Sequence, residues 1–304
     1  MGIPSPFADT TLISEFNNPG AIDMKPGLLA ALIILFVVLQ IWQRRTESST
    51  SPDSQSSPKW ILKWSDEFNG LNGAPPDESK WVVDTGGNGW GNNELQYYTP
   101  RRKNVRQEND NLIIEAIKED FTGPDGVRRD YTSARVNTAG RFSQQNGRFE
   151  ARIKIPRGQG IWSAFWLLGN DLPAKGWPSC GEIDIMENLG FEPSRIFGAL
   201  HGPGYSARNA LTSSYTLSNG RFSDDFHVFA VEWEPQRIRF YVDDQLYATR
   251  VSSDVPPGNA WVYDHPFSLI VNVAVGGDLP GKPDDSTVFP QRMLVDYVRV
   301  YARQ

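Results

Sequence analysis

The stretch FHVFAVEWEPQRIRFYV, residues 226–242, decides the fold class. Two runs rich in Val, Phe, Ile and Tyr flank a turn that contains Pro235, which is the pattern of a β-hairpin. Residues 149–155 alternate polar and apolar side chains with the period of two that a half-buried strand shows. Residues 294–301 indicate a closing strand of the same type. Antiparallel strands are therefore the expected building units.

The rest of the chain after residue 59 follows the same pattern. Gly, Asn, Asp and Pro divide it into many short strands. It contains no convincing amphipathic helix of 12 or more residues. Many short strands with frequent turn residues are typical of a β-sandwich or a β-barrel, so we expect an all-β fold.

Charge and cysteine content exclude several classes of function. The net charge is -6 and the basic runs are short, so nucleic acid is not an expected partner. Cys180 is the one cysteine, which excludes an internal disulfide framework and any zinc site built from several thiolates. About 240 residues, 59–304, are suited to one folded domain, and we expect that domain to be monomeric.

The region before residue 59 has three parts. Residues 1–26 show no periodic apolar pattern and are predicted to be disordered. Residues 27–42 are apolar and two arginines follow them, so we predict a transmembrane anchor with a basic flank over 27–45. The apolar stretch has 16 residues, slightly fewer than the roughly 20 that a comfortable span needs. Residues 46–58 form a Ser- and Pro-rich linker.

The segment Gly181-Glu182-Ile183-Asp184-Ile185-Met186-Glu187-Asn188 carries the chemistry. Its apolar residues indicate a strand, in which Glu182 and Asp184 share one face. In a regular strand Glu187 would lie on the other face. One extra residue in a β-bulge, at Met186 or at Ile185 with it, would return Glu187 to the face of the other two acids.

This spacing fits one type of catalysis. With the bulge, the Cα atoms of Glu182 and Glu187 are roughly 13 Å apart at about 3.3 Å per residue, and side chains that lean together close most of that gap. The expected carboxyl separation is near the roughly 5–5.5 Å of a retaining glycosidase. Asp184 lies between the two, where it can share a proton with a nucleophile or orient it. Two alternatives remain open: a solvated acidic strand face, and a calcium or magnesium cluster.

Aromatic residues favour the sugar-cleaving alternative. Trp162 and Trp166 share one face of an extended segment before the acids, and Trp177 lies five residues before Glu182. Indole rings offer flat apolar faces on which sugar rings can stack. A single Trp is more often a core residue, so it is the clustering that indicates a sugar site.

The chain resembles glycoside hydrolase family 16, and within it the laminarinase-like endo-1,3-β-glucanases. The resemblance covers about Trp60 to Tyr301, and the spacing Glu-x-Asp-x-x-Glu is the form found in this branch. Its other motifs are Trp64-Ser65-Asp66-Glu67-Phe68, Gly91-Asn92-Asn93-Glu94-Leu95-Gln96-Tyr97-Tyr98, Tyr131-Thr132-Ser133-Ala134-Arg135-Val136, the segment from Trp162 to Trp166, and Gly176-Trp177-Pro178-Ser179-Cys180-Gly181.

The resemblance implies a jelly-roll β-sandwich with the acids in a concave substrate cleft, and a catalytic domain at 59–304. It implies Glu182 as nucleophile, Glu187 as acid/base and Asp184 as helper, with no cofactor for catalysis. It also implies a set of substrate-binding residues: Asn93, Glu94, Arg135, Trp162, Trp166, Trp177 and His201. A structural calcium ion, frequent in the family, maps onto Glu67, the Asp110 carbonyl and Asp296.

Three functions remain from the resemblance. The first is endo-hydrolysis of β-1,3-glucan. The second is action of the same fold on another β-glucan or a galactan, by hydrolysis or transglycosylation. The third is non-catalytic glucan binding, which the presence of all three acids disfavours.

The expected location follows from this substrate. The arginines after residues 27–42 would, by the positive-inside rule, leave the domain in the cytoplasm. A glucan lies outside the cytosol, so we expect a single-pass membrane protein whose catalytic domain is extracellular or faces the cell wall. Secretion after cleavage is the alternative, although no small-x-small cleavage site follows the apolar stretch.

Overall fold

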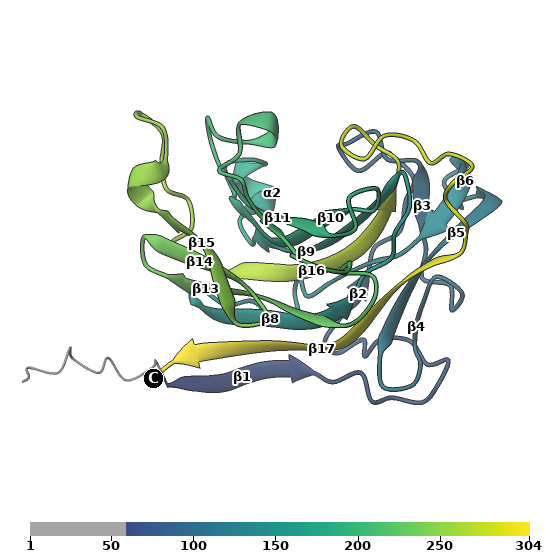
Figure 1. Ribbon diagram of the computed structural model, residues 1–304, viewed down its shortest axis with the longest axis horizontal. Coiled ribbons are helices and arrows are strands. Elements are labelled where there is room, and N and C mark those ends of the chain that lie inside the picture. Colours follow the sequence, from purple (N-terminus) through teal and green to yellow (C-terminus); the bar gives the residue numbers. More distant parts are fainter. Residues whose placement is uncertain (1–58) are drawn as a thin grey trace, which may run out of the picture. The chain divides into compact units, whose positions relative to one another are not determined.

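The computed structural model describes residues 59–304, which form a two-layered all-β domain (Figure 1). A ten-stranded sheet, the outer sheet, has the order β15-β14-β13-β8-β17-β5-β6-β3, with β1 paired to β17 and β4 paired to β5. Its strands are β1 (Trp60–Asp66), β3 (Gln96–Tyr98), β4 (Val105–Gln107), β5 (Leu112–Thr122), β6 (Arg128–Ser133), β8 (Gly147–Lys154), β13 (His227–Glu234), β14 (Arg237–Val242), β15 (Gln245–Val251) and β17 (Gln291–Arg303).

A seven-stranded sheet, the inner sheet, has the order β12-β11-β10-β9-β16-β7-β2. It is curved, and loops rise on both sides of its open face (Figure 1). Its strands are β2 (Val82–Val83), β7 (Arg135–Asn137), β9 (Ile161–Gly169), β10 (Glu182–Leu189), β11 (Arg195–His201), β12 (Ser213–Thr216) and β16 (Phe267–Val275).

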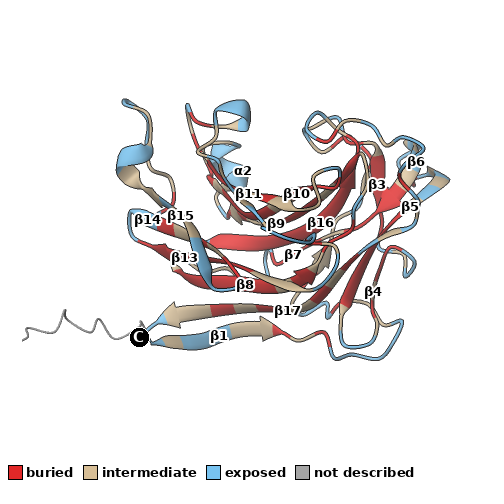
Figure 2. Ribbon diagram, viewed as in Figure 1, coloured by how far each residue is buried: buried red, intermediate tan, exposed pale blue. Residues whose placement is uncertain are grey.

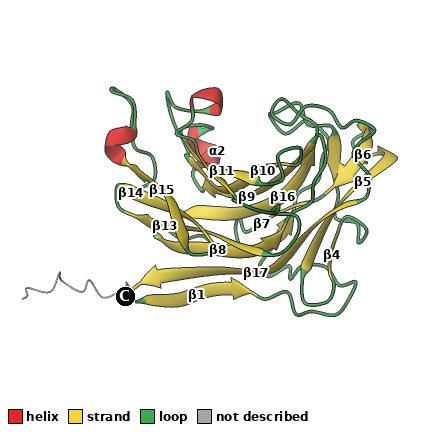
Figure 3. Ribbon diagram, in the orientation of Figure 1, coloured by secondary structure: helices red, strands yellow, loops and turns green. Residues whose placement is uncertain are grey.

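Within residues 59–304, helical structure is confined to three short segments in loops (Figure 3). They are α2 (Leu172–Lys175), η1 (Ala207–Asn209) and η2 (Ser252–Asp254). The expectation of an all-β sandwich is confirmed. The hairpin at 226–242 is the β13–β14 pair, in register from Phe229–Val242 to Glu234–Arg237.

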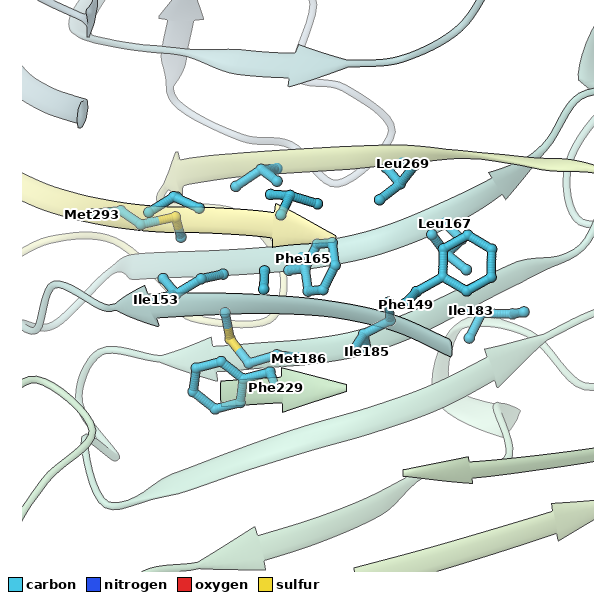
Figure 4. Packing of buried hydrophobic residues seen from close by; sticks show 14 of the residues in the cluster. Phe149, Ile153, Phe165, Leu167, Ile183, Ile185, Met186, Phe229, Leu269 and Met293 are labelled. Atoms are coloured by element: carbon cyan, nitrogen blue, oxygen red, sulfur yellow. The ribbon is translucent and has the colours of Figure 1, made fainter. Parts of the chain in front are cut away.

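The core lies between the two sheets, where the strands are most deeply buried (Figure 2). Apolar side chains from β8 and β13 of the outer sheet meet those from β9, β10 and β16 of the inner sheet (Figure 4). Full burial of each large apolar side chain contributes about 1.5–3 kcal/mol. This core fixes the face that each β10 residue presents, and so it positions the acids on the opposite, open face.

Two expectations about the N-terminal region need correction. Among residues 59–304, no helix has the length and apolar character needed to cross a bilayer. The transmembrane helix and the single-pass location expected from the sequence are therefore not part of the described fold. The predicted parts at 1–26, 27–45 and 46–58 lie outside the described residues.

Candidate active site

The three acids lie on β10, and the strand contains the expected bulge. Against β9, Asp184 pairs with Trp166 and Met186 with Phe165, so Ile185 is an extra residue with no partner of its own. Against β11, the register also shifts between Asp184 and Glu187. The bulge predicted from the sequence is therefore present.

The core accounts for the bulge. Ile185 and Met186 are consecutive, yet both are fully buried among the core side chains (Figure 4). Two consecutive residues on one face interrupt the alternation of the strand. Glu187 consequently returns to the open face, where Glu182 and Asp184 already lie.

Indole N–H groups hold the two outer carboxylates. The Trp177 Nε1–H donates to Glu182 Oε2 at 3.1 Å, and the Trp162 Nε1–H donates to Glu187 Oε1 at 2.9 Å. Trp162 lies on β9 next to β10, whereas Trp177 lies on the loop between β9 and β10. The aromatic residues near the acids thus fix carboxylate orientation as well as offering apolar faces.

His201 on β11 faces the middle of the acid row. Its Nε2 lies 2.9 Å from Asp184 Oδ2 and 3.7 Å from Glu182 Oε1. Its other ring nitrogen, Nδ1, accepts a hydrogen bond from the Ala207 N–H at 3.1 Å. Within residues 59–304 no lysine or arginine forms an ion pair with Glu182, Asp184 or Glu187.

Burial is the main cause that raises the pKa of all three acids. The pKa of Glu182 rises to about 8, first because burial disfavours its charge and then because Asp184 is near. Burial raises the pKa of Asp184 to about 8. Burial and then Asp184 raise the pKa of Glu187 to about 8. The acid row therefore holds protons at neutral pH that exposed carboxyls would release.

The acids lie on the floor of a cleft of about 830 Å³. Its walls come from β7, β9, β10, β11 and β16 of the inner sheet and from the surrounding loops. Of the residues predicted to bind substrate, six line it: Glu94, Arg135, Trp162, Trp166, Trp177 and His201. Asn93 does not line it. Its side-chain amide instead donates to both carboxylate oxygens of Asp278, at 3.0 and 3.1 Å, and Asp278 lines the cleft.

Arg135 stands between two indole rings of the cleft. Its guanidinium carbon lies 4.9 Å from the ring centroid of Trp90 and 4.8 Å from that of Trp166. Its Nε lies 2.9 Å from Asp84 Oδ2. A cation held over two aromatic faces stabilises both of them, so Arg135 braces Trp166 as part of the cleft wall.

A hydrogen-bond chain supports the same wall from below. The Trp166 Nε1–H donates to Asn272 Oδ1 at 2.8 Å, and the Asn272 amide donates to the Tyr98 hydroxyl at 3.2 Å. Tyr98 donates in turn to Glu94 Oε2 at 3.3 Å, and Gln96 donates to the same oxygen at 2.5 Å. Burial raises the pKa of Glu94, the largest effect acting on it. Glu94 thus lines the cleft and, through this chain of hydrogen bonds, also supports Trp166.

Sequence reasoning missed several residues of the cleft. Trp90 and Asn92 adjoin the motif that drew attention to Asn93 and Glu94, so that motif was the available signal. Asp278 had no such signal, because it reaches the cleft through a loop that is distant in sequence. The other lining residues that were not predicted include Tyr98, Leu172, Phe197, Ala207, Arg208, Thr212, Asn272 and Leu279.

The residues proposed for calcium lie elsewhere and are engaged with arginines. Both carboxylate oxygens of Glu67 accept from Arg299, at 3.0 and 2.7 Å, and Asp296 accepts from Arg152 at 2.7 Å. Asp110 lies in the turn between β4 and β5. Both carboxylate oxygens of Glu67 and one of Asp296 are thus already engaged by arginines. The calcium prediction stays a prediction, and no step below depends on it.

One other group of side chains has ligand atoms close enough together for a metal. Ligand atoms of Glu182, Asp184 and His201 all lie within 4.8 Å of one another. In residues 59–304 no other three His, Cys, Asp or Glu side chains meet this condition. The group coincides with the acid row, so a cation there would compete with proton chemistry.

Comparison with known proteins places this cleft in a family. A family model described as "Glycosyl hydrolases family 16" matches residues 92–299. The chain belongs to glycosyl hydrolase family 16. A β-glucanase of Rhodothermus marinus is 44% identical over 262 residues, which are 83% of this chain and 88% of that protein.

Two solved structures show the same fold. The endo-β-1,3-glucanase of Pyrococcus furiosus has a TM-score of 0.78 and 45% identity, covering 82% of this chain and 97% of that one. The laminarinase catalytic domain of Thermotoga maritima MSB8 has a TM-score of 0.77 and 46% identity, covering 81% and 99%. The family expected from the sequence motifs is confirmed, and the protein is a glycoside hydrolase.

Proposed function

We propose that this family 16 enzyme is a retaining endo-hydrolase of β-1,3-glucan, with Glu182 as nucleophile and Glu187 as acid/base. The observation that carries the proposal is the bulged strand β10, which brings Glu182, Asp184 and Glu187 to one face inside an indole-lined cleft. The relatives described above, whose names specify β-1,3-glucan or laminarin, support the choice of substrate.

The two outer acids differ in their neighbours, and this difference supports a separate role for each. The neighbouring Glu182 carboxyl lowers the pKa of Asp184 against the effect of burial, and His201 Nε2 faces both acids. A proton shared within this pair leaves Glu182 able to act as an anion. The pKa of Glu187 is raised to about 8, as that of Glu182 is, but Glu187 lies outside the pair that shares a proton and accepts its hydrogen bond from the Trp162 N–H. Glu187 is therefore the group suited to donate a proton.

Hydrolysis then takes two displacements. In the first, a Glu182 oxygen attacks the anomeric carbon while the bond to the leaving oxygen breaks, and Glu187 protonates that oxygen. A glycosyl ester with Glu182 results. In the second, Glu187 takes a proton from water, the water oxygen attacks the same carbon, and the ester bond to Glu182 breaks. Two inversions at one carbon give net retention.

The shape of the cleft supports internal cleavage. The lining runs from Trp90 and Asp278 on one side, across the acids, to Arg208 and Thr212 on the other. A groove that continues on both sides of the reacting carboxyls can bind a chain at its middle. Endo-action on a polysaccharide requires such continuity.

Product analysis tests the proposal. The protein is incubated with laminarin, barley mixed-linkage glucan, xyloglucan and agarose, and early products are separated by size. We expect laminarin to be cut fastest, with β-1,3-linked oligosaccharides of several lengths appearing together. Preferred cleavage of another polysaccharide would assign a different glycan to the same cleft, and release of single glucose units alone would contradict endo-action.

A further inference from the structure

A backbone N–H of the loop at 202–212 donates a hydrogen bond to His201, and His201 in turn faces the acid row. In the imidazole ring, a nitrogen that accepts a hydrogen bond carries no proton. The Ala207 N–H donates to His201 Nδ1 at 3.1 Å, so in the neutral ring the proton must lie on Nε2. That nitrogen is the one that faces Asp184 Oδ2 at 2.9 Å and Glu182 Oε1 at 3.7 Å.

The loop is built so that the Ala207 N–H stays in place. Gly202 and Tyr205 exchange two backbone hydrogen bonds of 3.0 Å, which close a tight turn directly after β11. Tyr205 is fully buried, and its hydroxyl donates to the Ala260 carbonyl at 2.9 Å. At the other end, the Leu211 N–H donates to the Leu200 carbonyl at 3.1 Å. Both ends of the loop are thereby tied to the sheet.

Ala207 itself adopts a backbone conformation that alanine disfavours. Its φ angle is +50°, in the left-handed region, where the Cβ atom crowds the backbone. Its side chain is exposed, so packing of that side chain does not require this conformation. Strained backbone often marks a functional constraint. Here the constraint is the direction of the Ala207 N–H, which donates its hydrogen bond to His201.

We propose that the 202–212 loop, through the Ala207 N–H, locks His201 as the Nε2–H tautomer, so that the protonated nitrogen is the one that lies 2.9 Å from Asp184 Oδ2. Ala207 and His201 are positioning residues, because they act on the reaction through Asp184 and Glu182. The Nε2–H faces both carboxyls, at 2.9 Å from Asp184 Oδ2 and 3.7 Å from Glu182 Oε1, and its dipole favours one negative charge on a pair that shares one proton.

The fixed tautomer of His201 also changes which ligands the acid row can bind. Glu182, Asp184 and His201 offer atoms close enough together for a metal ion. A metal ligand needs an unprotonated nitrogen, however, and Nε2 carries the proton in the locked tautomer. To free Nε2, the ring would have to move its proton to Nδ1, where it would meet the Ala207 N–H. The loop therefore keeps this group a proton-holding site.

The direct test is nitrogen NMR of the imidazole rings. The chain has only three histidines, so a long-range nitrogen–proton spectrum of the full protein labelled at histidine contains three ring systems. The His201→Gln spectrum identifies the His201 signals by their loss. We expect a protonated Nε2 and an unprotonated Nδ1, in wild type and in Ala207→Gly, which keeps the N–H. A proton on Nδ1 in the wild type would overturn the proposal.

Ala207→Pro removes the N–H and is expected to abolish the single-tautomer pattern. An unchanged pattern in a folded Ala207→Pro protein would overturn the assignment to Ala207. The variant also disturbs the φ angle, and if it fails to fold, the His201 variants below still decide.

Kinetics separate positioning from other roles, and this part alone rests on the proposed function. Gln can mimic the locked tautomer, since its side-chain oxygen can accept from Ala207 while its amide N–H faces Asp184. Leu can do neither. We expect His201→Leu to lose about 10-fold to 100-fold in kcat with KM little changed, as for a lost hydrogen bond to a charged group, and His201→Gln to recover most of that loss.

Equal losses in the Gln and Leu variants would show that the imidazole ring itself is needed and would overturn the proposal. A change in KM alone would make His201 a substrate contact and would also overturn it. If laminarin proves not to be a substrate, the proposed function fails, but the NMR result still stands or falls by itself.

Discussion

Both sheets carry buried acidic side chains, but the surroundings of these acids are opposite on the two sheets. On the outer sheet, Glu232 lies 2.9 Å from Arg239 and 3.5 Å from Arg148. Glu234 contacts three arginines, Arg237, Arg239 and Arg303. On the inner sheet, the acids of β10 face each other, two indole N–H groups and one histidine.

The consequence is a difference in the sign of the pKa shift. Although burial opposes it, the arginines around Glu234 lower the pKa of that acid below its ordinary value. Burial raises the pKa of Glu182, Asp184 and Glu187 to about 8, and the charge of Asp184 adds to the rise at Glu182 and at Glu187. Paired acids stabilise a fold as anions, whereas unpaired acids in a cleft hold protons for chemistry. The presence or absence of arginine separates structural from catalytic carboxyls here.

The largest expected effect comes from removing the nucleophile. Glu182→Ala should lower kcat on laminarin by about 10⁴-fold or more, because no ester can form. The matched control on the outer sheet, Glu232→Ala, should keep kcat within about twofold because that acid lies outside the cleft. Circular dichroism checks that both variants fold, and Glu182→Ala should still couple an α-glycosyl fluoride to an acceptor. Full activity of the Glu182 variant would remove the catalytic assignment.

The acid/base variant should fail in a different way. Glu187→Ala is expected to lose about 10²-fold to 10⁴-fold on glucan, where the leaving oxygen needs a proton. It should retain more activity on aryl glycosides with good leaving groups. Azide should accelerate its second step and give the β-glycosyl azide, identified by NMR. Azide rescue of the Glu182 variant to an α-azide, with none for Glu187→Ala, would reverse the two roles.

An arginine placed on the inner sheet would test the comparison itself. Leu168 on β9 pairs with Glu182 on β10 and lines the cleft. In Leu168→Arg, a guanidinium near the acids should lower their pKa values by about one unit or more. The basic limb of the pH–activity profile should move to lower pH by a similar amount, with Leu168→Met as the size control. If the basic limb stays at the same pH, the ionisation of these carboxyls does not determine where activity falls on the basic side.

The smallest expected effects are on the free energy of unfolding. They should have opposite signs for Glu187→Gln on the inner sheet and Glu234→Gln on the outer sheet. The pKa of Glu187 is raised in the folded state, so wild-type stability falls as pH rises from about 4.5 to about 8. Glu187→Gln removes this loss and should gain about 1–2 kcal/mol at pH 8, with no gain at pH 4. The gain corresponds to a Tm increase of roughly 2–8 °C in a domain of this size.

On the outer sheet, the dependence of stability on pH should be the reverse. The folded pKa of Glu234 is lowered, so its contribution is complete above about pH 4.5 and is lost as pH falls below that value. Glu234→Gln should therefore cost about 1 kcal/mol at pH 7 and less at pH 3. Calorimetric scans of both variants against pH measure the two signs. Destabilisation by both substitutions at pH 8 would contradict the distinction between the two sheets.

Much of this arrangement could be predicted from local sequence. Alternation and turn residues predicted the strands, and the spacing of Glu182, Asp184 and Glu187 predicted the bulge, because the strand pattern fails unless one residue is extra. The partners of the acids were less accessible. The hydrogen bond from Ala207 to His201 depends on a loop conformation, and a backbone N–H leaves no signature in the residue type.

Contacts between distant segments explain the remaining errors. Asp278 and Asn93 are far apart in sequence, and only the folded loops show that Asn93 holds Asp278 at the cleft instead of lining it.

Stereochemistry tests the central claim most directly. The claim is that the bulge in β10 brings Glu182 and Glu187 close enough for double displacement, with no room for an activated water between them. Proton NMR follows the anomeric signals during the first minutes of laminari-oligosaccharide hydrolysis, before mutarotation. The β-anomer should appear first and the α-anomer only later. An α-anomer formed first would contradict the account.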